Sequence, residues 1–151
     1  MASREVTVIN SSYRDPYSET RLQINTDTGV AYSENGGGRL FYIDQTSLSL
    51  RNRRVLYDDT QKPIVTFYSK IMRPQGRCKV FRGKNNDPSE FLFSVKKARD
   101  SATDTTVLNV LLANNQNQRK NDYRVFISGN KNSCKVYLGE YIDESYMVAK
   151  V

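Results

Sequence analysis

The sequence predicts an all-β, antiparallel protein, and three observations carry this prediction. Short runs alternate apolar with polar residues or are rich in β-branched and aromatic residues. Segments rich in Gly, Pro, Asn and Asp separate these runs. No stretch of about 12 residues or more keeps the 3.6-residue period of a capped helix. We therefore expect a meander of ten or eleven strands and no long helix.

The length of 151 residues and the absence of a composition break favour one domain. Residues 1–19 are polar and contain the turn signal Asp15-Pro16, so we expect a flexible leader followed by a single domain at 20–151. The ten or eleven strands are expected among twelve candidate runs, which are residues 22–24, 30–32, 39–43, 48–50, 54–57, 64–68, 77–82, 91–95, 107–112, 123–127, 135–138 and 146–151.

The glycine-rich turn at residues 35–38 invites comparison with a phosphate-binding loop. It lacks the Lys and Ser/Thr of a P-loop, and no helix pattern follows it. Glycine supplies positive φ angles without steric cost, so a hairpin turn is the favoured interpretation. Residues 26–29 and 58–63 are predicted to be turns in the same way.

The charge of the chain is concentrated in its middle third. Residues 51–99 hold 13 basic and 4 acidic residues, a net charge of +9, within a total of +7. Such a segment can attract an anionic membrane, an acidic partner or nucleic acid, while alternating cations on a solvated sheet face look the same. The charge alone leaves these interpretations open.

Several chemistries are absent from the sequence. With no His, the chain has neither a His-based triad nor a His-containing zinc site. Cys78 and Cys134 lie far apart and are expected to be buried free thiols. We therefore expect no enzyme activity, no cofactor and no metal. No segment has the apolar length of a signal peptide or a membrane span, so we expect a cytoplasmic protein, with a peripheral location at the plasma membrane or a nuclear location as alternatives.

A series of short motifs follows one order from about residue 50 to residue 151. The clearest are Arg54-Val55-Leu56-Tyr57-Asp58, Lys62-Pro63-Ile64-Val65-Thr66-Phe67, Arg77-Cys78-Lys79-Val80-Phe81-Arg82-Gly83, Phe93-Ser94-Val95-Lys96-Lys97 and Ser133-Cys134-Lys135-Val136-Tyr137-Leu138-Gly139. In order and spacing they resemble the plant LURP-one-related family. Cys78 stands where the family has Trp, which removes aromatic burial at that position.

The resemblance implies a tubby-like antiparallel β-barrel. Family members continue into a further strand and an apolar central helix, whereas this chain stops at Val151, so we expect an incomplete barrel that lacks the central C-terminal helix. The resemblance also implies a non-catalytic binding module in plant basal defence or stress signalling. Related tubby proteins bind phosphoinositides, which makes phosphoinositide-dependent membrane tethering the alternative function.

The candidate binding site is a basic patch made of Arg51, Arg53, Arg54, Lys70 and Arg73. Cations gathered at one rim of a barrel can hold anionic phospholipid headgroups, and each contributes about 1 kcal/mol near an anionic surface. A protein partner is the other candidate ligand. Nucleic acid ranks third, because no recognition helix or ribbon motif is visible, although aromatic stacking on single strands is conceivable.

An incomplete barrel also predicts an apolar interior and an open edge. We expect Phe91, Phe93, Val95, Val107, Leu111, Val125, Ile127, Val136 and Leu138 to face inward. A barrel of this width needs a plug, a ligand or water inside it. Unpaired backbone groups at an edge invite association, so we expect self-association through the open edge.

Overall fold

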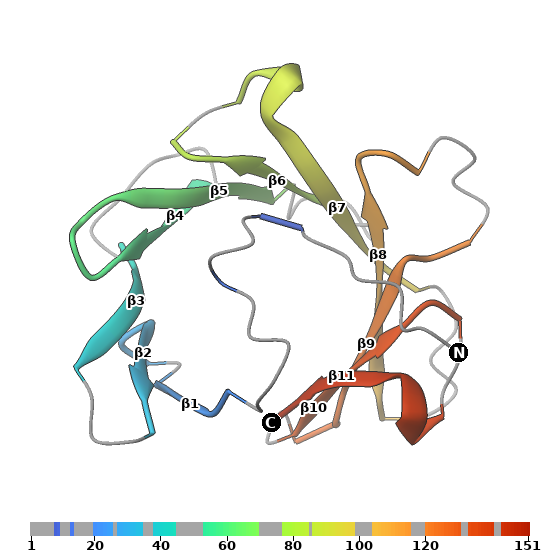
Figure 1. Ribbon diagram of the computed structural model, residues 1–151. Coiled ribbons are helices and arrows are strands. Elements are labelled where there is room, and N and C mark those ends of the chain that lie inside the picture. The colour runs from blue at the N-terminus through green and yellow to red at the C-terminus, as the bar shows by residue number, and fades with distance from the viewer. Residues whose placement is uncertain are drawn as a thin grey trace. The chain divides into compact units, whose positions relative to one another are not determined.

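The structure is a computed structural model of the chain. It describes residues 8–9, 13, 20–25, 27–34, 38–44, 53–69, 77–84, 86–98, 104–115, 120–130, 133–140 and 143–151. These residues form strands, turns and short 3₁₀ helices, with no α-helix among them (Figure 1). The prediction of an all-β protein without a long helix is confirmed for this part of the chain.

Eleven strands follow one another in the sheet in the order in which they occur along the chain. β1 and β11 therefore stand at the two ends of the strand order. The strands are β1 Leu22–Asn25, β2 Val30–Ser33, β3 Arg39–Ile43, β4 Arg53–Asp58, β5 Pro63–Ser69, β6 Arg77–Arg82, β7 Phe91–Lys97, β8 Thr106–Leu112, β9 Tyr123–Ile127, β10 Cys134–Leu138 and β11 Met147–Lys150. Two 3₁₀ helices, η2 at Pro88–Glu90 and η3 at Glu144–Tyr146, precede β7 and β11. The strand predicted at residues 48–50 lies outside the described residues.

Contacts along the chain group it into two compact units, which we describe separately. Unit 1 comprises residues 1–67 and 81–92, and unit 2 comprises residues 68–80 and 93–151. β5, β6 and β7 each contribute residues to both units. The single domain expected at 20–151 and the flexibility of the leader stay predictions.

The predicted turns of unit 1 are held by short polar side chains. The Asn25 Oδ1 accepts hydrogen bonds from the amides of Asp27 and Thr28 at 2.9 and 3.1 Å. Gly29 follows with a φ of 69°, a conformation that favours glycine. At the next predicted turn the Asp58 carboxylate accepts from the amides of Thr60 and Lys62, both at 2.9 Å. Both turns therefore form where turn residues of this kind predict them.

A β-bulge in β3 sorts the side chains of unit 1 onto two faces. Ala31 pairs with Phe41, but the next residue, Tyr32, pairs with Arg39, so Leu40 is the extra residue. We call the face that carries Ile24, Ala31, Phe41, Ile43 and Leu56 the pocket face, and the face that carries Tyr32, Arg39, Tyr42 and Tyr57 the tyrosine face. The bulge places Arg39 on the tyrosine face.

The core of unit 1 lies around β5 and the end of β6. Ile64, Val65 and Thr66 are successive and all buried, so both faces of β5 are covered here. The hydroxyl of Thr66, which has no exposed surface, donates to the Gly83 carbonyl at 2.6 Å. The Gly83 amide in turn donates to the Ile64 carbonyl at 2.8 Å. These bonds satisfy the buried polar groups where β6 turns away from β5.

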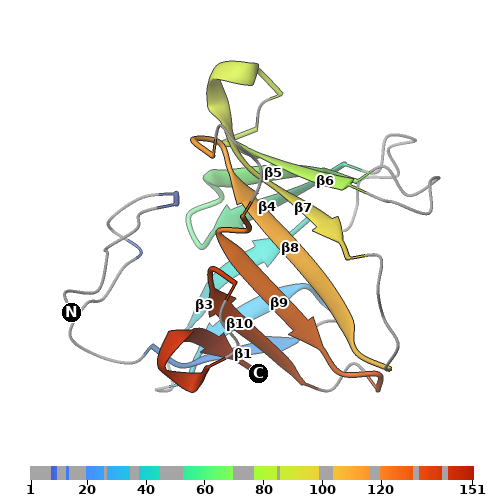
Figure 2. The same cartoon turned by 90° about the vertical axis from the view of Figure 1, so that its right-hand side faces the viewer.

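In unit 2 the strands β8, β9 and β10 lie side by side as an antiparallel meander (Figure 2). Val125 pairs with Leu108 on one side and with Val136 on the other. Val107 pairs instead with Phe126. The expectation that Val107 and Leu111 share a face with Val125 and Val136 is therefore wrong. β8 is apolar on both faces, with Leu108, Val110 and Leu112 on one and Val107 and Leu111 on the other, so alternation in the sequence does not reveal its register.

Candidate functional site

The five residues of the predicted basic patch are only partly described. Arg51, Lys70 and Arg73 lie outside the described residues. Arg53 and Arg54 are successive residues of β4, so their side chains leave the strand on opposite faces. Arg54 lies on the pocket face and Arg53 on the tyrosine face. The described structure therefore does not bring these two cations together on one face, and the five-residue patch stays a prediction.

The pocket face of unit 1 is hollowed into a pocket of about 360 Å³. Its apolar lining comes from β1 to β4, which are held in register by the pairing of β1 with β2, of β2 with β3 and of β3 with β4. Ile43 stands directly opposite Leu56, and Ala31 directly opposite Phe41. The lining residues are Leu22, Ile24, Asn25, Gly29, Val30, Ala31, Phe41, Ile43, Arg54 and Leu56.

Arg54 is the single charged residue in this lining. It lies two residues before Leu56, so both side chains leave β4 on the pocket face. Its side chain is exposed, whereas Ala31 in the pocket is only 9% exposed. The pocket thus combines an apolar floor with one guanidinium group.

The tyrosine face carries a compact group of aromatic rings with a cation over one of them. Tyr42 and Tyr57 are directly opposite each other on β3 and β4, and their rings stack with centroids 5.2 Å apart and planes 15° apart. The guanidinium carbon of Arg39 lies over the Tyr42 ring, 4.3 Å from its centroid. This distance is within the range of a cation–π interaction. The group therefore presents a cation and flat aromatic surface together.

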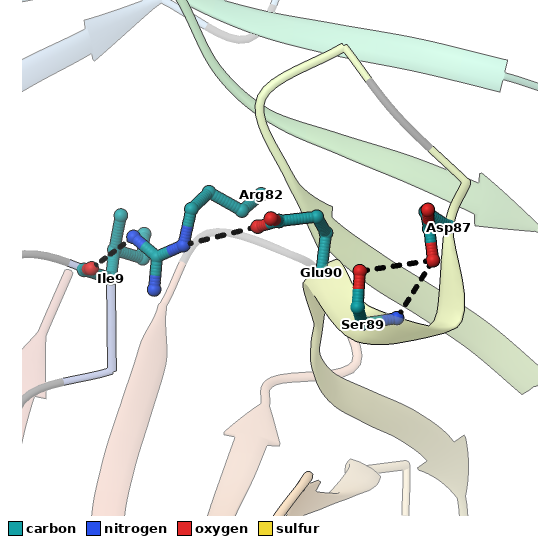
Figure 3. Close-up of polar contacts among 5 residues, drawn as sticks. All are labelled: Ile9, Arg82, Asp87, Ser89 and Glu90. Atoms are coloured by element: carbon teal, nitrogen blue, oxygen red, sulfur yellow. Dashed lines mark hydrogen bonds and ion pairs between the residues drawn. The ribbon is translucent and has the colours of Figure 1, made fainter.

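Arg82 links three parts of unit 1, as Figure 3 shows. Its Nη1 donates to the backbone carbonyl of Ile9, and its Nε lies 3.5 Å from a carboxylate oxygen of Glu90. Glu90 belongs to η2, whose first turn is capped by the Asp87 carboxylate. In the same unit the Tyr13 ring meets the Phe41 ring edge-on at 5.8 Å. Ile9 and Tyr13 of the leader therefore contact β6 and β3.

In unit 2 a polar pair crosses β8 and β9. Asn109 and Arg124 are directly opposite each other, yet the Oδ1 of Asn109 and the Nε of Arg124 are buried without a hydrogen-bond partner. The Nη1 of Arg124 lies 3.9 Å from the Glu140 carboxylate, and its guanidinium carbon lies 5.1 Å from the centroid of the Phe126 ring. Asn109, Glu140 and Phe126, the residues that surround Arg124 here, all belong to unit 2.

Both cysteines are free and half-buried. Burial raises the pKa of the Cys78 thiol and of the Cys134 thiol, so both stay protonated at neutral pH. A protonated thiol is neither a good nucleophile nor a metal ligand. Within the described ranges, no three side chains of metal-binding type gather. No helix of the described segments has the length and apolar composition needed to cross a bilayer.

The pocket is not among the sites predicted from the sequence, although the sequence contains a signal for it. Ile24, Phe41, Ile43, Arg54 and Leu56 fall on alternate positions of their strands. Period-2 alternation would have separated Arg54 from Arg53 and joined it to Leu56. The bulge at Leu40 could not have been foreseen in the same way, because nothing in the sequence around it marks an extra residue.

These features define an all-β protein of meandering antiparallel strands with a ligand-sized apolar pocket on one unit. A family model described as LURP-one-related matches residues 17–151. The chain therefore belongs to the LURP-one-related family, as the motifs predicted.

Relatives and a solved structure agree with this assignment. Protein LURP-one-related 15 of Arabidopsis thaliana is 30% identical over 138 residues, which are 88% of this chain and 63% of the relative. Protein LURP-one-related 1 of the same plant is 34% identical over 115 residues, 76% of this chain and 51% of the relative. This chain thus spans about half to two thirds of the length of these curated relatives.

The X-ray structure of a protein from Arabidopsis thaliana superposes with a TM-score of 0.70 and 30% identity. The match covers 95% of this chain and 78% of that chain. The all-β, tubby-like fold class is therefore confirmed.

Proposed function

We propose that this protein is a non-catalytic binding module that serves plant defence or stress signalling. The observation that carries the proposal is the tyrosine face of unit 1, where Arg39 lies over Tyr42 and Tyr42 stacks on Tyr57. Surfaces that pair cations with flat aromatic rings are typical of recognition sites. The protonated thiols add support, because they supply no nucleophile. Protein LURP1 of Arabidopsis thaliana, 30% identical over 115 residues, supports the signalling context through the family resemblance.

The second candidate function is phosphoinositide-dependent tethering to a membrane. It is supported by the +9 charge of residues 51–99 and by the two cations at the start of β4. Each cation that lies near an anionic surface contributes about 1 kcal/mol to binding. Anionic phospholipid headgroups and an acidic protein partner would satisfy the same charges.

Co-sedimentation with liposomes separates these candidates. The protein is mixed with vesicles that contain phosphoinositide, phosphatidylserine or only neutral lipid, at low and at physiological salt. Tethering predicts that phosphoinositide vesicles bind most, and that binding falls as salt screens the charges. The variant Arg53→Glu/Arg54→Glu is expected to lose this binding.

A matched control is available on unit 2. Lys135 and Lys150 are cross-strand partners and both are exposed, so Lys135→Glu/Lys150→Glu makes the same change in net charge on β10 and β11 instead of β4. It should bind vesicles nearly as well as the unchanged protein. If the unchanged protein ignores anionic vesicles at low salt, tethering is refuted and a protein partner is the ligand to seek. Equal binding to any polyanion, nucleic acid included, would indicate nonspecific electrostatics.

Self-association belongs to the same proposal, through β1 and β11 at the ends of the strand order. Leu22 and Ile24 on β1 and Val148 on β11 are exposed large apolar residues. Light scattering that rises with protein concentration would support association, whereas a constant monomer mass up to high concentration would exclude it.

A further inference from the structure

The tyrosine face of unit 1 carries positive charge that no carboxylate of its own strands neutralises. Asp58 is the only acidic residue within the bounds of β1 to β4. It pairs with Phe41, so its side chain lies on the pocket face, where it accepts hydrogen bonds from the amides of Thr60 and Lys62. Arg39 is exposed on the tyrosine face. This face of β1 to β4 is therefore complementary to an anion.

Tyr32 places an exposed aromatic ring beside this cation. It stands directly opposite Arg39 in the pairing of β2 with β3, so the two Cβ atoms are about 5 Å apart. Tyr32 is 41% exposed, whereas Tyr42 and Tyr57 of the neighbouring strands β3 and β4 are half-buried (Figure 1). Tyr32 is thus the ring of this face that a ligand can reach most easily.

The two half-buried tyrosines hold Arg39 in position. Its guanidinium carbon lies 4.3 Å from the centroid of the Tyr42 ring, and Tyr42 stacks in turn on Tyr57. A side chain that is already held in place loses little conformational freedom when it binds a ligand. A guanidinium can contribute in two ways, because its N–H donors bind phosphate oxygens and its plane can stack on a base.

A ligand that matches this surface must combine negative charge with flat groups. Single-stranded nucleic acid combines them, because its phosphates are anionic and its unpaired bases are free to stack. Proteins that bind single strands use basic surfaces together with aromatic side chains, in some modules on the face of a β-sheet. The net charge of +7 favours the same ligand. An acidic protein segment would match the charge of Arg39 but offers no base to lie on Tyr32.

We propose that the tyrosine face binds single-stranded nucleic acid, with a base stacked on Tyr32 and a phosphate bound by Arg39. This ligand rests on the proposed function, since it occupies the recognition surface that carries it. Neither Tyr32 nor Arg39 belongs to the predicted headgroup patch, and both lie on the opposite face of the strands from the pocket. Tyr42 and Tyr57 are positioning residues, because they act through Arg39.

The test measures the fluorescence anisotropy of a labelled strand of about 12 nucleotides, within the usual site size of single-strand binding domains. The strand has a mixed sequence and is used as DNA, as RNA and as the DNA annealed to its complement. Electrostatic attraction alone favours the duplex, because its charge density is higher. Stacking needs unpaired bases, so the full chain should bind the single strands about tenfold more tightly than the duplex. Binding of either single strand supports the proposal, and the tighter one identifies the natural ligand.

Two variants with matched controls test the two residues. Tyr32→Ala should weaken binding of the single strand about tenfold, because it removes the ring on which a base stacks. Tyr32→Phe keeps the ring and should bind normally. Arg39→Gln should lower the slope of log affinity against log salt by about one, as expected for one lost phosphate contact. Lys135→Gln removes the same charge at an exposed position of β10 and should leave this slope nearly unchanged.

Thermal melts followed by circular dichroism identify any loss of binding that is caused by unfolding. Tyr32 and Arg39 are exposed, so their variants are expected to fold. If Tyr32→Ala melts early, Tyr32→Leu replaces it, because leucine keeps apolar bulk but has no aromatic ring. Loss of affinity in Tyr32→Leu with normal binding by Tyr32→Phe would support stacking on Tyr32.

Several outcomes would overturn the nucleic-acid site. Equal or tighter binding of the duplex would show that charge alone attracts the strand. Single-strand binding that survives Tyr32→Ala, or equal losses in Arg39→Gln and Lys135→Gln, would show that these residues do not form the site.

A labelled polyglutamate chain in the same assay separates this proposal from the proposed function. If polyglutamate binds and loses affinity in Arg39→Gln while the single strands do not bind, the tyrosine face recognises acidic protein. The nucleic-acid site is then wrong and the proposed function stands. If the single strands, polyglutamate and the anionic vesicles all fail to bind, the proposed function is contradicted as well.

Discussion

Units 1 and 2 are built from the same antiparallel meander but treat their cations differently. In unit 2, Arg124 lies between Glu140 and the Phe126 ring, and its side chain is only 22% exposed. In unit 1, Arg54 is exposed at the edge of an apolar pocket. Arg124 joins neighbouring strands of unit 2, whereas Arg54 of unit 1 stays accessible. The comparison teaches that the same strand pattern can either engage an arginine or leave it accessible, depending on what packs against its face.

The largest expected effect comes from a substitution in the core of unit 1. Phe81 is 8% exposed, and its ring lies 5.5 Å from that of Phe91. Phe81→Ala should lower the free energy of unfolding by about 3–5 kcal/mol, because it removes buried apolar surface and leaves a cavity. Urea unfolding followed by circular dichroism measures this, with Val148→Ala as an exposed control expected to change little. A loss below about 1 kcal/mol would mean that this region is loosely packed.

Two glycines give a smaller and contrasting pair of effects. In unit 2, a Cβ added at Gly129 would lie 2.7 Å from the Asp104 Cβ and 2.9 Å from the Asp104 carbonyl oxygen. Gly129→Ala should therefore cost about 1–3 kcal/mol, since backbone must move. In unit 1, Gly83 has open space around it but a φ of +65°, so Gly83→Ala should cost about 1 kcal/mol through backbone strain alone. Chemical unfolding measures the loss of stability in both variants. A larger loss in Gly83→Ala than in Gly129→Ala would contradict this account.

A stabilising change is expected at the polar pair of unit 2. The Asn109 Oδ1 is buried without a partner, and an unpaired buried polar atom costs free energy. Asn109→Leu should raise the free energy of unfolding by about 1 kcal/mol, because it removes this unpaired oxygen. Arg124→Met provides the companion variant for a double-mutant cycle. A destabilised Asn109→Leu protein would show instead that the Asn109 Oδ1 is bonded in solution, to water or to the Arg124 Nε.

The smallest expected effects concern the pH dependence of stability, which should differ between the two units. Hydrogen bonds from Thr60 and Lys62 lower the pKa of Asp58, and those from Ser89 lower the pKa of Asp87, both below the usual 3.8. A carboxyl group whose pKa is lower in the folded state stabilises the fold at pH values above its pKa in the unfolded state. This stabilisation is lost as the pH falls through the pKa in the folded state. Unit 1 should therefore lose stability below about pH 4. Asp58→Asn should make this acid loss shallower in melts recorded across pH.

Unit 2 should respond at the alkaline end. Burial, with a contribution from Asp122, raises the pKa of Tyr123 above 10.0, and burial raises that of Cys134 above 9.0. The folded state holds these protons longer than the unfolded state, so stability falls as pH rises above the unfolded values. Tyr123→Phe should reduce this alkaline loss and leave the acid side unchanged. If Tyr123→Phe changed the stability equally at acid and at alkaline pH, the proposed difference between the two units would be wrong.

Much of the fold could be predicted from local sequence, and much of the site could not. Short-range chemistry marked the strands and the turns at Asn25 and Asp58, because a turn is decided by a few adjacent residues. The pairing of faces depends on register, and register is a long-range property. That is why the pattern of β8, apolar at Val107 and Leu108 alike, predicts the wrong face for Val107. It is also why Arg53 and Arg54, adjacent in sequence, were grouped although their side chains leave the strand on opposite faces.

The extra residue at Leu40 decides which surface carries the charge of Arg39. If β3 kept Leu40 but paired with β2 without the bulge, Leu40 would stand opposite Tyr32, and Arg39 would turn away from Tyr42 toward the pocket face. A second guanidinium would then lie near the apolar lining, and the tyrosine face would lose the cation that lies over the Tyr42 ring. Deletion of Leu40 would instead leave Arg39 opposite Tyr32, with its side chain still on the tyrosine face. Aligned sequences with a gap at this position are therefore expected to keep the positive charge on the same surface, whereas sequences that keep the residue but lose the bulge would move it.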